Sequence, residues 1–422
     1  MNYVYAGLEI GNTSLRFIVS EIIHDKVNIL YKKVVPGIFL KNHLVVDPKT
    51  IGKMVDEFVD DANFLLKMNI SKVLLVLPSF GLTINKISRG INLQEPKTIT
   101  FSDINALKMD IMIEKSNNEK LSPIEIISTS YSVDDKETTF KPIGQRAFKS
   151  LKLEGYLYSI NKKVYENYLQ IFVKTKSKIL DVVIDAFAWQ EEVFKSVADK
   201  ENAVIVDYGH KKTLVMVYSH QFLSSIDALP FGVNNIDKDV NYVVDCDNFA
   251  KIEELRKTCV KLNDQPAEEP FIIKQKCFPL APNKIVDFTS NELNVVAKAR
   301  IIESFEKIYK TALERTEGNL STIHLVGGGA SLHGLEEFLH GYMHLDEIVI
   351  YNSNTINAKN PSLWNVLGAI KYKHHSNTEE SKRETSLKNN FSYTLKKNVV
   401  FPRVFSEMSK SINKKLFNKG AQ

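Results

Sequence analysis

The sequence predicts an α/β fold of two lobes that repeat one another, with an inserted α+β subdomain and an amphipathic helix at the C-terminal end. The main observation is a pattern of strand, tight turn, strand and strand, which begins near residue 3 and again near residue 203. In both copies an acid stands at the end of the first strand and a glycine follows two residues later, Glu9 with Gly11 and Asp207 with Gly209. A second observation is the glycine run 327–329, which follows an apolar segment of strand length.

Composition and charge indicate a globular body with a basic tail. The chain has 422 residues, of which 44% are hydrophobic and 25% are charged, values typical of folded proteins with several domains or subdomains. Residues 371–422 contain 12 Lys and Arg against 4 Asp and Glu, and because the whole chain carries +5, the other 370 residues carry −3. An acidic body is not typical of nucleic-acid-binding proteins, so we expect no nucleic-acid partner. Three scattered cysteines, no secretory signal and no long apolar stretch favour a cytoplasmic protein without a membrane-spanning helix.

The first lobe is predicted from apolar patterns in the first ninety residues. We expect strands at Tyr3–Ile10, Leu15–Ile23, Val27–Val35 and Val73–Leu77. Asp47 and Pro48 begin a helix, because apolar residues recur every three or four positions from there to Leu65. After an inserted α+β segment over residues 88–166, we expect helices at Lys163–Lys174 and Phe187–Ala198, with a strand at Ile179–Ile184 between them.

The second lobe repeats this order and carries a mostly helical region. Strands are expected at Ala203–Asp207, Thr213–Tyr218, Phe222–Leu229 and Ile323–Val326. Helices are expected at Asn248–Leu262, Glu292–Leu313, Leu332–Tyr342 and Pro361–Tyr372.

Two hairpin turns have the composition of phosphate-binding loops, because glycine lets a phosphate approach the backbone N–H groups and a strand-end carboxylate can hold a hydrated Mg²⁺. The candidate residues of the first loop are Gly11, Asn12, Thr13 and Ser14, with Glu9 as a metal residue that acts through water. The candidates of the second loop are Asp207, which is also a water-mediated metal residue, with Gly209, His210, Lys211, Lys212 and Thr213. Taken alone, each loop is more typical of an ordinary turn than of a binding site.

A third candidate loop contains Gly327, Gly328 and Gly329 between a predicted strand and a predicted helix. Consecutive glycines lower the stability of regular structure, so three in a row favour a site where backbone and ligand meet closely. Together the three loops predict a nucleotide held between two lobes.

Six short blocks carry a resemblance to a known family. They are Leu8–Gly11, Pro142–Gly144, Val206–Gly209, Pro230–Gly232, Ile252–Arg256 and His324–Ala330. In order and spacing, over most of residues 1–372, the sequence resembles the FtsA family of bacterial cell-division proteins, within the actin-like ATPase superfamily. The resemblance implies an actin-like fold (ribonuclease H-like and duplicated), bound ATP and Mg²⁺, and filaments formed by self-association. It also implies that Gly232, Glu253 and Arg256 contribute to the nucleotide site, the last two by contacting adenosine. An exposed ion pair one helical turn apart is an equal alternative for Glu253 and Arg256.

The resemblance further implies a division of the chain into subdomains. The first lobe would comprise residues 1–87, 167–198 and 355–372, with the inserted subdomain at 88–166. The second lobe would comprise 199–232 and 306–354, with a helical subdomain at 233–305 that receives the C-terminal peptide of FtsZ. The chain would act at the cytoplasmic face of the cell membrane, at the division site, as a peripheral protein that anchors FtsZ filaments.

The end of the chain has a different character. Residues 373–398 are polar and predict a flexible linker. Residues 399–422 predict a basic amphipathic helix that lies in the surface of an anionic membrane. Its apolar stripe is Phe401, Val404, Phe405, Met408, Ile412 and Leu416, and its basic residues include Arg403, Lys410, Lys414 and Lys415. A helix that docks on the body or on a partner is the alternative.

Departures from the family pattern leave other functions open. Glu9 replaces an aspartate, Ser14 stands where the family has a lysine, and the second loop has His210–Lys212 in place of a glycine-rich run. We therefore expect weak ATP hydrolysis at most, and the sequence assigns no catalytic residue. A membrane scaffold with a degenerate nucleotide site and a small-molecule phosphotransferase are the alternatives. His340 and His344 have a metal-like spacing, but no third ligand is evident.

Overall fold

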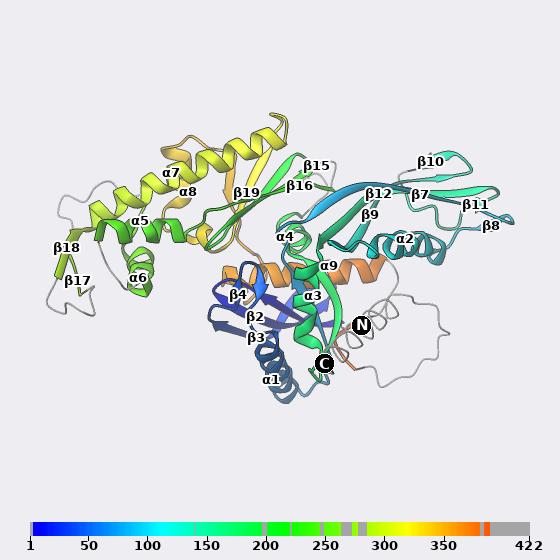
Figure 1. Cartoon of the computed structure of the whole chain (residues 1–422), viewed down its shortest axis with the longest axis horizontal. Coiled ribbons are helices and arrows are strands. Elements are labelled where there is room, and N and C mark those ends of the chain that lie inside the picture. The colour runs from blue at the N-terminus through cyan, green and yellow to red at the C-terminus, as the bar shows by residue number, and fades with distance from the viewer. Residues whose placement is uncertain are drawn as a thin grey trace, which may run out of the picture. The chain divides into compact units, whose positions relative to one another are not determined.

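The computed structural model describes residues 3–138, 140–195, 201–219, 222–244, 249–262, 272–276, 285–379 and 384–388. Contacts between residues divide the chain into two compact units. Figure 1 labels the helices and strands of the chain. Unit 1 comprises Met1–Val46, Val73–Gly81 and Asp181–Glu384, and unit 2 comprises Asp47–Lys72, Leu82–Leu180 and Thr385–Gln422. Among these described segments, no helix has both the length and the apolar character needed to cross a membrane.

The first sheet of unit 1 has the strand order β13-β6-β1-β2-β3. Its strands are β1 (Tyr3–Ile10), β2 (Ser14–Ile23), β3 (Lys26–Pro36), β6 (Lys72–Leu77) and β13 (Lys178–Ile184). β1 runs antiparallel to β2 and parallel to β6. A short hairpin of β4 (Leu40–Lys41) and β5 (Leu44–Val45) follows β3.

The second sheet has the order β16-β15-β14-β19-β20. Its strands are β14 (Ala203–Tyr208), β15 (Thr213–Ser219), β16 (Phe222–Leu229), β19 (Thr322–Val326) and β20 (Ile348–Ile350). Read from β20, this order matches that of the first sheet. β14, β15 and β16 are joined by hairpins, as β1, β2 and β3 are, and β19 is parallel to β14. The predicted repeat is therefore confirmed.

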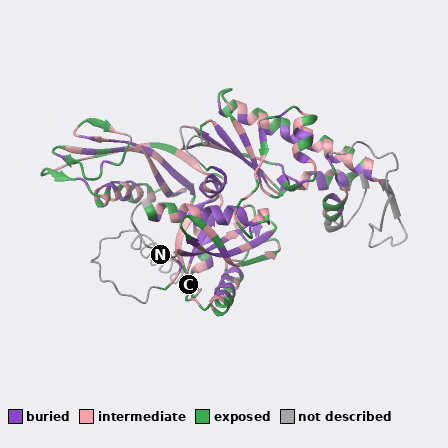
Figure 2. Cartoon of the chain, turned by 180° about the vertical axis from the view of Figure 1, so that it is seen from behind, coloured by how far each residue is buried: buried purple, intermediate pink, exposed green. Residues whose placement is uncertain are grey.

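Two helices of unit 1 connect these sheets through buried contacts. α4 (Asp185–Val193) and α9 (Trp364–Glu379) pack so closely that a Cβ on Gly368 would collide with the carbonyl oxygen of Ala188. α9 also lies on β1, where a Cβ on Gly7 would stand 2.7 Å from a methyl group of Val366. On the other side, Tyr218 of β15 donates a hydrogen bond to the Ala186 carbonyl of α4 (2.8 Å). Figure 2 shows the central strands and these helices as largely buried.

The helical part of unit 1 contains α5 (Asn234–Val244), α6 (Phe249–Cys259), α7 (Ser290–Arg315) and α8 (Leu335–Gly341). α7 begins with a capping box, in which Thr289 and Glu292 bond to each other's backbone N–H groups. The prediction of a mostly helical segment is confirmed, but it missed the hairpin of β17 (Ile272–Lys276) and β18 (Ile285–Thr289). Each of these strands has only five residues, too few to give a clear alternation of apolar and polar positions.

Unit 2 contains the predicted inserted α+β segment. Its four-stranded sheet has the order β10-β9-β12-β7, formed by β7 (Thr83–Asn92), β9 (Leu121–Val133), β10 (Lys136–Thr138) and β12 (Ser150–Asn161). α2 (Phe101–Ser116) packs on this sheet through a buried apolar cluster that includes Ile104, Leu107 and Leu153. The unit also contains β8 (Lys97–Thr98), β11 (Arg146–Ala147), α1 (Pro48–Leu66) and α3 (Lys162–Leu169).

The flexible linker does not begin at residue 373, as the sequence predicted. α9 continues through Glu379, because buried polar residues beyond 372 have partners. Lys373 is buried, with 4% of its surface exposed. Its ammonium pairs with Asp181 (2.7 Å) and Glu384 (2.9 Å). Asn377 donates a hydrogen bond to the hydroxyl of Tyr5 (2.9 Å). The predicted amphipathic helix at 399–422 lies outside the described residues.

Candidate functional site

Three acids gather where three elements of unit 1 end or begin. Glu9 and Asp207 occupy the same position, one residue before the end of β1 and of β14. Asp185 is the first residue of α4, directly after β13. The charges of Asp185 and Glu9 raise the pKa of Asp207, and the charge of Glu9 raises that of Asp185. The predicted pair of carboxylates is thus a cluster of three.

Asp185 is the functional candidate that sequence reasoning missed. It follows an apolar strand, as Glu9 and Asp207 do near their strand ends, and that signal was available in the sequence. The glycine two residues later, which marked the other two acids, is absent because Asp185 leads into a helix and not into a hairpin. One oxygen of Asp185 accepts a hydrogen bond from the backbone N–H of Ser79 (2.8 Å), which fixes the carboxyl beside the loop after β6.

The surroundings of Asp185 and Asp207 disfavour their ionised forms. Burial, followed by the charges of Asp185 and Glu9, raises the pKa of Asp207 to about 7. Burial also raises the pKa of Asp185 to about 6, although the Ser79 hydrogen bonds and the Lys212 charge oppose this shift. Both residues keep part of their surface accessible to solvent. Such a cluster of carboxyls is suited to bind a cation.

Arg16 joins the first loop to the acids. Its guanidinium donates to Oε1 of Glu9 (2.7 Å) and to the hydroxyl of Ser14 (3.0 Å), and Glu9 and Arg16 are cross-strand partners of β1 and β2. Among the described residues, Oε2 of Glu9 is buried and has no hydrogen-bond partner. Within the loop itself, the Gly11 N–H donates to the Ser14 carbonyl (2.9 Å), whereas the Thr13 side chain is exposed.

The second loop is held against the segment that follows β16. The N–H groups of Val233 and Asn234 donate to the carbonyls of Gly209 (3.0 Å) and His210 (2.8 Å). A Cβ on Gly232 would stand 2.7 Å from the His210 carbonyl oxygen, so the predicted glycine is required for this close approach. Thr213 points inward and donates to the Phe231 carbonyl (2.9 Å), and its hydroxyl is therefore engaged within the protein.

The glycine run lies directly beside Asp207. β14 and β19 are parallel, with Asp207 paired to Val326, and a Cβ on Gly327 would collide with Oδ1 of Asp207. Gly327 has φ 90°, a conformation that favours glycine. A Cβ on Gly329 would collide with the ring of Tyr208, whereas nothing lies within 4 Å of a Cβ on Gly328. Gly327 and Gly329 are thus tightly packed, whereas the space beside Gly328 is open.

Lys212 projects into the same region and Lys211 is exposed. The Lys212 ammonium lies 4.8 Å from the ring centre of Phe80 and 3.5 Å from Nδ1 of His43. Burial lowers the pKa of Lys212, and the charges of Asp185 and Asp207 partly offset this effect. His43 and Phe80 were not predicted as site residues, because neither lies in a glycine-rich loop.

Glu253 and Arg256 of α6 lie one turn apart and form an ion pair (4.0 Å), but Arg256 is buried whereas Glu253 is partly exposed. The guanidinium of Arg256 is buried and donates to Oδ1 of Asp237 (2.7 Å), while Glu253 pairs with Lys257 (2.7 Å). Burial lowers the pKa of His210, and the nearby charge of Glu253 opposes this shift. Glu253 therefore lies beside the second loop, and its contact with adenosine stays a prediction, as does that of Arg256.

The residues present fit a nucleotide with Mg²⁺ on three counts. Within the described part of the chain, Oε2 of Glu9 lacks a hydrogen-bond partner, the carboxyls of Asp185 and Asp207 form no ion pair within 4.0 Å, and Gly328 faces open space. In that part of the chain, no three His, Cys, Asp or Glu side chains are grouped as direct ligands of one metal ion. Mg²⁺ commonly keeps several waters and contacts few carboxylates, so the predicted contacts through water stay a prediction.

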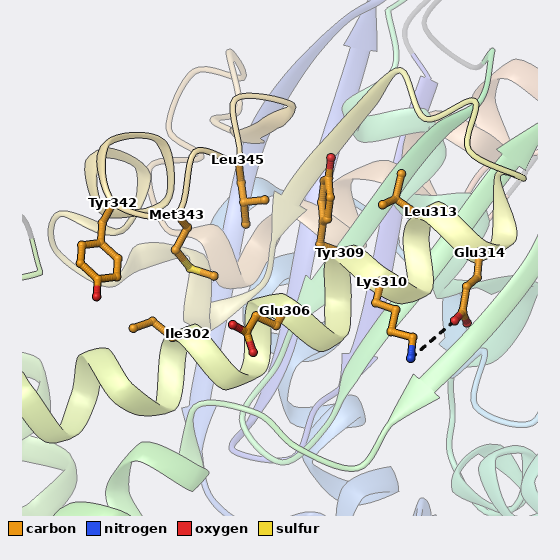
Figure 3. A pocket seen from close by; sticks show the side chains of 9 residues that line it. All are labelled: Ile302, Glu306, Tyr309, Lys310, Leu313, Glu314, Tyr342, Met343 and Leu345. Atoms are coloured by element: carbon orange, nitrogen blue, oxygen red, sulfur yellow. Dashed lines mark ion pairs between the residues drawn. The ribbon is translucent and has the colours of Figure 1, made fainter.

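A separate pocket of about 590 Å³ lies between α7 and the segment that follows α8 (Figure 3). Ile302, Tyr309 and Leu313 of α7 line one side, and Met343 and Leu345 line the other. None of its lining residues belongs to the acid cluster or to the three loops. His340 of α8 contacts the backbone: its Nε2 is 2.6 Å from the Ile348 carbonyl oxygen.

Comparison with curated proteins finds similarity to cell division protein FtsA from several bacteria. The Bacillus subtilis protein is 22% identical over 378 residues, which cover 88% of this chain and 83% of that protein. The Streptococcus pneumoniae protein is 22% identical over 373 residues, which cover 87% and 79%. The Buchnera aphidicola protein is 24% identical over 338 residues, which cover 78% and 77%. No protein-family model matches the chain.

Comparison with solved structures finds the same fold in proteins of low sequence identity. A chain of the PilM–PilN type IV pilus biogenesis complex matches with a TM-score of 0.57 and 12% identity, over 87% of this chain and 98% of that chain. MreB5 of Spiroplasma citri bound to ADP matches with a TM-score of 0.50 and 12% identity, over 90% and 98%. These matches confirm the predicted actin-like fold.

Proposed function

We propose that this chain, an actin-like relative of the cell division protein FtsA, acts in cell division, where it binds ATP with Mg²⁺, polymerises on the cytoplasmic membrane and anchors FtsZ filaments to it. One observation carries the nucleotide proposal. The acid cluster, the second loop and the open space at Gly328 lie together in unit 1, around the strand pair that joins Asp207 to Val326.

The roles of individual residues follow from their positions. Glu9 and Asp207 would hold the metal through water, and Mg²⁺ would neutralise charge on the phosphates. The N–H groups around Gly328 would face the phosphates, because that glycine has open space where its neighbours are tightly packed. Asp185 would hold a proton or orient a water molecule at the oxygen that Ser79 does not bind.

Replacing Gly328 with Val tests this proposal. We expect the variant to fold normally, because nothing lies within 4 Å of a new Cβ, but to lose at least about tenfold in ATP affinity, because the side chain would fill the space proposed for the phosphates. Affinity is measured by calorimetric titration with ATP and Mg²⁺, and folding by thermal melting.

Gly341→Val is the matched control. Gly341 at the end of α8 also has open space around its Cβ, but it lies in none of the three loops. The control should bind ATP as the original chain does. Equal affinity in Gly328→Val would contradict the proposed position of the phosphates.

The tail would supply the membrane contact. Its apolar stripe and its basic residues suit an amphipathic helix in the surface of an anionic membrane, with about 1 kcal/mol from each Lys or Arg near the surface. The helical subdomain at 233–305 would receive the C-terminal peptide of FtsZ. Similarity to FtsA supports both assignments and also self-association into filaments.

A membrane scaffold with a degenerate nucleotide site is the second candidate. One observation favours it: Arg16 already engages Oε1 of Glu9, and Lys212 already stands near Asp185 and Asp207, so protein cations occupy part of the region proposed for the metal. A chain that binds no ATP, with or without Mg²⁺, but still binds membranes would support the scaffold.

A further inference from the structure

We propose that His43 and Phe80 are positioning residues which hold Lys212 as a built-in counter-cation for the nucleotide phosphates, so that nucleotide binding depends on Lys212 more than on Mg²⁺. This inference rests on the proposed function, because it concerns the same nucleotide site. It assigns roles to two residues outside the three loops. It also gives a role to Lys212, which stands in the second loop where the family has a glycine-rich run.

The three side chains form a stack in unit 1. The rings of His43 and Phe80 lie nearly parallel, with 17° between their planes and 3.5 Å between their centres. The Lys212 ammonium lies over the Phe80 ring, 4.8 Å from its centre, at a distance suited to a cation–π interaction. It is also 3.5 Å from Nδ1 of His43, which can accept a hydrogen bond when the imidazole is neutral.

The electrostatic surroundings keep His43 neutral. Burial, followed by the charge of Lys212, lowers the pKa of His43 to about 4. At pH 7 the imidazole is therefore an acceptor that can orient the ammonium without repelling it. A neutral acceptor orients the ammonium and does not neutralise its charge.

The backbone that carries His43 is unfavourable for its residue type. Asn42 and His43 form the two-residue turn between β4 and β5, with φ 49° and φ 65°. Both values are typical of a type I′ turn, in which glycine is the preferred second residue. Histidine adopts a positive φ more often than most residues but at a higher cost than glycine, and the stack on Phe80 opposes that cost.

The loop that carries Phe80 also fixes an acid of the cluster. Ser79 donates its N–H to Asp185, and Phe80 is the next residue. The stack and the acid cluster are therefore attached to the same short segment, which places Lys212 beside Asp185. Among the described residues Lys212 forms no ion pair within 4.0 Å, although the charges of Asp185 and Asp207 act on it. An ammonium has three donors, and one of them faces His43, so donors remain for phosphate oxygens.

Arg16 is not equivalent to Lys212, although both are cations near the acids. Its guanidinium is already bonded to Glu9 and Ser14. Of these two cations, Lys212 is thus the one with donors available for a ligand, and a buried ammonium beside phosphate balances charge much as a metal ion does.

Affinities for ATP, ADP and AMP are measured by calorimetric titration of the full chain, in Mg²⁺ and in EDTA. For the original chain we expect ATP affinity to fall less than about tenfold in EDTA, because Lys212 supplies a cation. For Lys212→Met in EDTA, we expect losses of at least about tenfold for ATP and ADP and less than about twofold for AMP. Lys212→Arg should retain most of the ATP affinity.

The positioning role is tested by a double-mutant cycle. His43→Gly suits the turn, so it should fold at least as well as the original chain, and Phe80→Leu keeps an apolar side chain. Each should weaken ATP binding about threefold to tenfold in the original background and have no further effect beside Lys212→Met. Lys41→Met is the matched control, since Lys41 is an exposed lysine of the same β4–β5 hairpin, and it should bind ATP normally.

The outcomes separate this inference from the proposed function. A chain that binds no ATP in either condition overturns both. ATP binding that requires Mg²⁺, or that Lys212→Met leaves unchanged, overturns only the inference about Lys212. Additive losses in the double-mutant cycle overturn the positioning role of His43 and Phe80.

Discussion

Asp185 and Asp207 are acids whose folded-state pKa lies above the usual value near 3.8, at about 6 and about 7. Each therefore holds a proton in the folded state at pH values where the unfolded chain has released it. Between about pH 4 and pH 7 the folded state binds more protons, so the free energy of unfolding falls as the pH rises. The stabilising contribution is full below pH 4 and is lost as the pH rises through about 6 for Asp185 and about 7 for Asp207.

Asp207→Asn should remove much of this pH dependence. At pH 8 we expect the variant to have a free energy of unfolding about 1–2 kcal/mol higher than that of the original chain, because a neutral amide replaces a carboxylate that is costly to ionise. Near pH 4 the two should be similar. The measurement is chemical denaturation followed across this pH range without nucleotide.

Asp346→Asn serves as the control for that comparison, since Asp346 is exposed and belongs to no loop of the site. It should leave the pH dependence unchanged. Equal stability of Asp207→Asn and the original chain at pH 8 would show that the cluster does not disfavour ionisation.

At the scale of elements, the contact between α4 and α9 decides where Asp185 stands. Asp185 is the first residue of α4, and Gly368 of α9 meets the Ala188 carbonyl one turn further along. Asn365 of α9 also donates to the Asp185 carbonyl (3.0 Å). The acid is thus placed by a helix pair and not by its own loop.

Gly368→Ala should destabilise the chain by about 1–3 kcal/mol, although alanine is the better helix former. The added methyl group would collide with the Ala188 carbonyl and push the helices apart. Gly341→Ala, in open space at the end of α8, should be neutral or slightly stabilising. Thermal or chemical denaturation compares the two, and an unchanged stability of Gly368→Ala would mean that the helices can separate at little cost.

At the scale of the whole molecule, the proposed role couples a nucleotide-binding body to a membrane through residues 399–422. The tail accounts for the positive net charge of the chain, since the body without residues 371–422 carries −3. An anionic membrane would attract the tail and not the body.

Deleting residues 400–422 should abolish sedimentation with vesicles of phosphatidylglycerol and phosphatidylcholine while ATP affinity stays the same. FtsZ added to the mixture should pellet with the vesicles only when the full chain is present. Met408→Asp should act like the deletion, because it puts a charge in the apolar stripe.

Ser406→Asp adds the same charge about 160° away around the predicted helix and should reduce sedimentation much less. A truncated body that still pellets with vesicles would exclude the tail as the membrane contact.

The sequence by itself determined the parts of this protein that local patterns encode. The acid–glycine turns at Glu9 and Asp207, the apolar strands before them and the run at Gly327 were enough to predict the duplicated sheets and two of the three acids. Each of these signals lies within a few residues, where strand period and glycine conformation act.

Only the tertiary structure decided how Asp185, His43, Phe80 and Lys212 meet. These residues come from a helix start, a hairpin, a strand-end loop and a second-lobe turn, and no local pattern relates them. Their positions depend on sheet order and on the α4–α9 packing, because contacts between residues far apart in sequence are set by the arrangement of whole elements. The same reason explains the end of α9, where Asp181 and Glu384 hold Lys373 in a segment whose composition alone predicts a flexible linker.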